Sequence, residues 1–174
     1  MALRRWKPIA WPEEEHVRLR SALARLDPWS FWAVRLDRPP GAEYAVVGST
    51  GAFVISICGL DGYVESVGAG LRVGEVSISG FREVKRAAKV VRGRLSHVSV
   101  STEVRPLICL TRAIAGTSRD VRGVRVVRLD DLPSEIASRE RTLDPGTAKK
   151  AAAVLGPLVV SAPEVHRDDA GGSA

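Results

Sequence analysis

Residues 42–58 constrain the fold of this chain more than any other segment, because they read as two apolar strands separated by a short turn that contains glycine. The first strand is expected at about 43–48 and the second at about 52–58. The second strand, Phe53-Val54-Ile55-Ser56-Ile57-Cys58, is apolar on both faces. This pattern is typical of a strand that lies inside a sheet covered on both sides. The segment therefore predicts a hairpin at the centre of a layered domain.

The elements around this hairpin predict an α/β sandwich. Acidic residues after Pro12 open a helix, because acids in a first turn complement the helix dipole. Leu19, Leu23 and Leu26 then follow at helical spacing. A strand is expected at 31–36, short strands at 63–67 and near 75–78, a second helix at about 81–96, and strands at 105–110 and 124–129. Arg119–Gly123 is expected to be a loop. Asp130 or Asp131 is expected to cap a short helix, and a last helix is expected from Pro145 to about Leu155.

Length and composition favour one domain without a membrane anchor. The chain has 174 residues, 45% of them hydrophobic, and no apolar run is long enough to span a bilayer. Residues 1–11 form a Trp-rich segment, residues 12–155 the domain, and residues 156–174 a tail expected to be mobile. Because the basic start lacks an apolar core typical of a secretory signal, the expected location is the cytoplasm.

The hairpin resembles the core of the nuclease-related domain (NERD) family, a branch of the PD-(D/E)xK nucleases. The resemblance covers about residues 12–155 and is most specific in the hairpin and in the Gly62 that follows it. It implies a restriction-endonuclease-like core: a central mixed sheet flanked by helices, in the order helix, three strands, helix, strand. In that family the first hairpin strand carries a metal-binding Asp, and the second carries an acid-x-Lys pair.

The catalytic positions implied by this resemblance hold Tyr44, Ser56 and Cys58. A phenol and a hydroxyl are weak ligands for Mg²⁺, and a thiol stands where the chemistry uses a cation. We therefore expect a pseudoenzyme that needs no metal or cofactor. An active nuclease with Mg²⁺ or Mn²⁺ held by relocated acids is the alternative, and Glu15, Asp61 and Glu65 are its candidates. Glu15 can equally serve the helix dipole, Asp61 a turn, and Glu65 a solvated strand.

Five basic residues lie along one flank of the second predicted helix: Arg82, Lys85, Arg86, Lys89 and Arg92. At 100° per residue they fall within an arc of roughly 120°. Such a stripe can follow a phosphate backbone, and the formal net charge of +6 permits contact with nucleic acid. A solvated helix face gives the same pattern.

Tryptophans gather near the N-terminus. Trp29 and Trp32 are expected to pack under the first helix, whereas Trp6 and Trp11 either cover the core or dock on a protein partner. The sequence thus predicts a degenerate nuclease-fold domain that binds nucleic acid or protein. A structural subunit of a larger assembly remains a further alternative.

Overall fold

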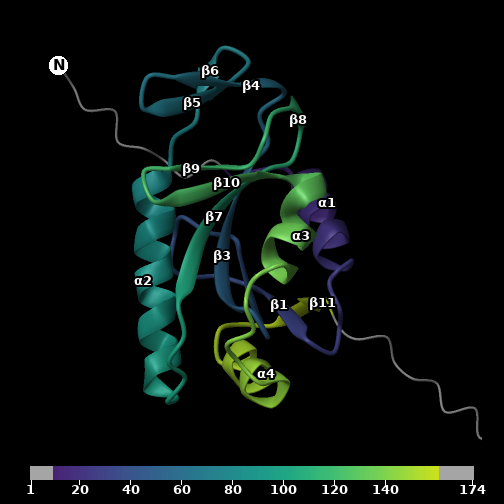
Figure 1. Cartoon of the computed structure of the whole chain (residues 1–174), viewed down its shortest axis with the longest axis vertical. Helices are drawn as coiled ribbons and strands as arrows, with labels where there is room; N and C mark the ends of the chain where they lie inside the picture. Colours follow the sequence, from purple (N-terminus) through teal and green to yellow (C-terminus); the bar gives the residue numbers. More distant parts are fainter. Residues whose placement is uncertain (1–9, 161–174) are drawn as a thin grey trace, which may run out of the picture.

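The computed structural model describes residues 10–160 as a mixed α/β domain (Figure 1). Its helices are α1 (Glu13–Leu23), α2 (Phe81–His97), α3 (Leu132–Ala137), α4 (Pro145–Ala153) and the short 3-10 helix η1 (Leu129–Asp131). Its strands are β1 (Phe31–Arg35), β2 (Tyr44–Gly48), β3 (Gly51–Cys58), β4 (Gly62–Val67), β5 (Gly70–Val73), β6 (Val76–Ser77), β7 (Val104–Leu110), β8 (Ala113–Ala115), β9 (Arg119–Val121), β10 (Val124–Arg128) and β11 (Leu158–Val160).

The main sheet is mixed and has seven strands in the order β11-β1-β2-β3-β7-β10-β9. Neighbours from β11 to β3 are antiparallel, and β9 is antiparallel to β10, whereas β3-β7 and β7-β10 are parallel pairs. A parallel pair needs a long crossover, and α2 lies within the one that joins β3 to β7. The central position predicted for the hairpin is confirmed.

Helices cover both faces of this sheet, which gives the domain two cores. Phe53, Ile55 and Ile57 of β3 pack on the face that carries α1 and α3. Val54 and Cys58 pack on the opposite face, against α2 and α4. Trp32 belongs to this second core, so the expectation that it packs under the first helix is wrong. Trp29 is also not under that helix, because it is 62% exposed.

A smaller sheet, in the order β6-β5-β4-β8, lies beyond the ends of β3 and β7 (Figure 1). The chain enters it through Gly62, whose φ is +129°. A Cβ at this position would lie 3.0 Å from the backbone nitrogen of Gly74. Glycine is therefore required where the chain passes from β3 of the main sheet into β4 of the smaller sheet.

Several boundaries differ from the sequence expectations. Arg119–Val121 forms β9 where a loop was expected, and Leu158–Val160 pairs with β1 inside the expected tail. Neither Asp130 nor Asp131 caps α3 by a side-chain hydrogen bond; Asp131 instead pairs with Arg128. Trp6 and residues 161–174 lie outside the described residues. Within the described part, no helix is both long and apolar enough to cross a membrane.

Candidate functional site

The three hairpin positions of the family resemblance do not converge on one site. Tyr44 lies opposite Ile55 in the β2–β3 ladder, so these two side chains share the face under α1. Ser56 and Cys58 point to the other face, because successive side chains of a strand alternate. The acid brought to Ser56 is Glu43, whose Oε2 accepts a hydrogen bond from the Ile57 backbone N–H at 2.8 Å.

Tyr44 is buried beneath α1, and its hydroxyl is surrounded by basic side chains. His16 Nδ1 lies 3.0 Å from this oxygen, and Arg20 and Arg35 donate to it at 3.3 and 3.5 Å. Burial lowers the pKa of His16, and the nearby Arg35 charge acts in the same direction. Two guanidinium groups at one oxygen repel a divalent cation, so this position does not replace the missing metal ligand.

Two of the three candidate relocated acids, Glu15 and Asp61, lie beside the Arg112 guanidinium group. Glu15 is only 1% exposed and accepts hydrogen bonds from the Thr111 hydroxyl and from Arg112 Nε. Arg112 also lies 3.0 Å from Glu14 and 3.9 Å from Asp61. The bond to Glu15 is the main reason that the pKa of Arg112 is raised. Arg112 therefore supplies the cation that these carboxylates share.

Glu65, the third relocated acid, lies on β4 and pairs with Arg72 at 2.5 Å. In residues 10–160, no group of three or more His, Cys, Asp or Glu side chains is arranged to hold a metal ion. No sequence pattern predicts that Arg112 pairs with Glu15, because the two residues lie 97 positions apart in the chain.

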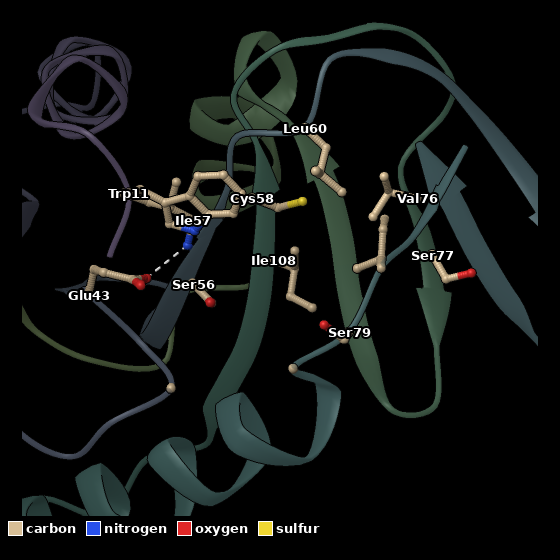
Figure 2. A pocket seen from close by; sticks show the side chains of 13 residues that line it. Trp11, Glu43, Ser56, Ile57, Cys58, Leu60, Val76, Ser77, Ser79 and Ile108 are labelled. Carbon is tan, nitrogen blue, oxygen red and sulfur yellow. Dashed lines mark hydrogen bonds between the residues drawn. The ribbon is translucent and has the colours of Figure 1, made fainter. Parts of the chain in front are cut away.

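A hollow of about 100 Å³ lies between the C-terminal end of β3, the start of α2 and strand β6 (Figure 2). Ser56, Cys58 and Ile108 of the main sheet face Val76 and Ser79 across it in this view. Glu43 and Trp11 line the side near α1. Trp11 packs against the chain after β3, where a Cβ at Gly59 would come 2.9 Å from the indole ring. Trp11, expected to be a core cover or a partner anchor, packs against the core under α1 and also forms a wall of the hollow.

Burial raises the pKa of Glu43, although hydrogen bonds from the Ile57 N–H and the Ser56 hydroxyl oppose this effect. The Glu43 carboxyl therefore binds its proton more tightly in the folded state than in the unfolded state. Its contribution to the free energy of unfolding is full below the usual pKa of 4.5 and is lost as the pH rises through the folded pKa. We therefore expect Glu43→Gln to raise the unfolding midpoint in urea at pH values well above 4.5, and to have little effect below it. A variant less stable than wild type at high pH would contradict this prediction.

The two thiols are structural. Burial raises the pKa of Cys58 to about 11 and raises that of Cys109 as well. Both cysteines are free and packed in the cores. Cys58 therefore stays a protonated thiol near neutral pH, which is a poor nucleophile.

The basic stripe of α2 faces solvent: Arg82, Lys85, Arg86, Lys89 and Arg92 are all exposed. None of them lies within ion-pair distance of a carboxylate in the described residues, whereas eight arginines elsewhere do. Lys85, Lys89 and Arg92 line a groove of about 210 Å³ between α2 and the start of β7.

The β9–β10 turn adds a further exposed cation beside this helix. Lys85 Nζ donates to the Arg122 carbonyl oxygen at 2.8 Å, and the Arg122 guanidinium lies 5.8 Å from the Phe81 ring centroid. The stripe is called the basic face below, and it comprises the five α2 residues and Arg122.

Comparison of the chain with protein-family models, with curated proteins and with solved structures found no match.

Proposed function

We propose that this domain binds nucleic acid through the basic face. The observation that carries the proposal is the concentration of cations without carboxylate partners, within the described residues, on one exposed helix. Eight arginines elsewhere in the described residues are neutralised by carboxylates, whereas the five cations of α2 have no such partner, so this helix carries a row of uncompensated positive charge. Side chains at three- and four-residue steps form a continuous row that can contact successive phosphates.

We further propose that the domain is a degenerate relative of the NERD nucleases that binds without cutting. The hairpin, the helix between β3 and β7, and Gly62 support the resemblance. The residues at the catalytic positions argue against cleavage. Tyr44 is surrounded by cations, Ser56 and Cys58 supply neither a carboxylate nor a cation, and Arg112 already neutralises Glu15. Metal-assisted hydrolysis needs a divalent cation held by oxygen ligands, and this arrangement does not provide that ligand set.

The test is a binding titration with short single-stranded and double-stranded DNA and RNA across a range of salt. If five or six cations contact phosphates, log K should fall with log[salt] with a slope of about −4.5 to −5.4 on duplex DNA. Binding that does not depend on salt would contradict the proposal.

Cleavage and metal binding are measured on the same protein. With Mg²⁺ or Mn²⁺ we expect no cleavage beyond a chelator control, and Mn²⁺ calorimetry should give no one-site isotherm. Cleavage that is lost in both Glu15→Ala and Asp61→Ala would instead identify an active nuclease with relocated acids.

The smaller sheet favours a second candidate function, a protein-binding or assembly module. Its large apolar side chains include Tyr63, Val76 and Ile114, which are 61%, 51% and 63% exposed. They lie on three strands of this sheet, and large exposed apolar side chains can mark a surface that binds a partner. Light scattering of the purified chain should then show self-association that Ile114→Asp abolishes. A monomer at all concentrations would remove self-assembly as its role.

A further inference from the structure

We infer that the hollow between β3, β6 and α2 binds an unpaired guanine base of a single strand held on the basic face. This inference rests on the proposed function, since the basic face supplies the sequence-independent affinity. It names a specificity site that phosphate contacts cannot provide, because phosphates carry no sequence information.

The hollow lies at the end of the basic face. Ser79 and Gly80 line it, and Arg82, the first cation of the stripe, follows two residues after Gly80. The start of α2 lies directly below the hollow in Figure 2. A strand whose phosphates contact Arg82 and Lys85 therefore carries its next base to the mouth of the hollow.

The walls suit the insertion of a flat ring by its edge. Trp11 presents an indole on one side, and Leu60 and Ile108 supply apolar surface. Stacking of a base on an aromatic side chain contributes about 1–3 kcal/mol. A volume of about 100 Å³ with an open mouth accommodates the base edge and leaves the sugar outside.

Glu43 selects the base. A carboxylate has roughly four acceptor positions. The Ile57 N–H occupies one of them, which leaves acceptor positions for a ligand. Guanine presents two adjacent donors, N1–H and N2–H, on its Watson–Crick edge. Adenine, cytosine and thymine each place an acceptor beside the donor, so one carboxylate oxygen would face an acceptor. Guanine is therefore the base that satisfies Glu43.

The experiment compares a ten-nucleotide thymidine oligomer with the same oligomer carrying one central guanosine, by fluorescence anisotropy. We expect the guanosine to raise affinity roughly tenfold, the scale of a good two-hydrogen-bond contact. An inosine at that position lacks the N2 amine and should lose most of the gain. The same comparison is repeated with RNA.

Variants test whether the gain in affinity from guanosine depends on the residues of the hollow. Glu43→Gln and Trp11→Ala should each bring the guanosine-to-thymidine affinity ratio close to one, while circular dichroism checks that they are folded. Glu65→Gln, a carboxylate of the smaller sheet paired with Arg72, is the matched control and should keep the ratio. Because two separate residues are tested, misfolding of one variant still leaves a decisive result from the other.

The outcomes separate this inference from the proposed function. If all oligomers bind with equal, salt-dependent affinity, the guanine site is wrong and the basic face stands. If the guanosine gain survives in both Glu43→Gln and Trp11→Ala, the selectivity arises elsewhere and the inference is also wrong. If no oligomer binds at low salt, both the basic face and the guanine site are overturned.

Discussion

Replacing Lys85, Arg86 and Lys89 together by alanine is expected to weaken DNA binding by about two orders of magnitude near 0.1 M salt. Each cation that contacts a phosphate releases counterions, so three lost contacts should reduce the salt slope by about 2.7. All three side chains are exposed on α2, and their loss removes no ion pair within the described residues. The folded domain should therefore persist, and the loss should be similar for every nucleic-acid sequence.

The control for this triple variant has to remove the same charge elsewhere. Arg25, Lys149 and Lys150 are exposed, and their replacement by alanine also lowers the formal net charge by three, from +6 to +3. If binding reflects only net charge, both variants should lose affinity equally. If it reflects the basic face, the control should retain most of its affinity and its slope. Equal losses would contradict the proposed function.

The sequence predicts local elements of this fold well because their signals are local. The two apolar runs around a glycine-flanked turn define the β2–β3 hairpin, and the spacing of Phe81, Val84 and Val91 defines α2. The exposure of the basic face follows from the same periodicity, since residues between the buried positions must face outward.

The face of each hairpin residue depends on the register of the two strands, which the apolar pattern alone does not determine. The turn has two residues, Ser49 and Thr50, so Gly48 pairs with Gly51 and Tyr44 pairs with Ile55. Counting outward from that turn places Glu43, rather than Tyr44, beside Ser56. The necessary information was in the sequence, but it required the loop length as well as the apolar pattern.

Other features depend on contacts between distant segments, and no local pattern carries them. β11 pairs with β1 across more than a hundred residues. The alternation of side chains along β1 places Trp32 on one face of the strand. Which helices cover that face depends on the complete sheet, and here they are α2 and α4. The pairing of Arg112 with Glu15 belongs to the same class.

Arg112→Ala is expected to lower the unfolding temperature by about 10 °C, because it leaves the Glu15 carboxylate without its cation. Glu15 is 1% exposed, so its carboxylate has little contact with water in the folded domain and depends on its protein partners. The Thr111 hydroxyl remains as a donor, but a neutral donor stabilises a buried charge less than an ion pair does. Thermal unfolding followed by circular dichroism measures the effect.

Two further variants decide whether the buried charge is the cause. Arg112→Ala combined with Glu15→Gln removes that charge while the amide oxygen can still accept from Thr111, so it should unfold at a higher temperature than Arg112→Ala alone. Arg72→Ala breaks the exposed pair with Glu65 and should change the unfolding temperature by only about 1–2 °C. If Arg112→Ala were as mild as Arg72→Ala, Glu15 would need no counter-cation. Glu15 and Asp61, two of the relocated acids of the nuclease alternative, would then not be held by Arg112, so this stability measurement also bears on function.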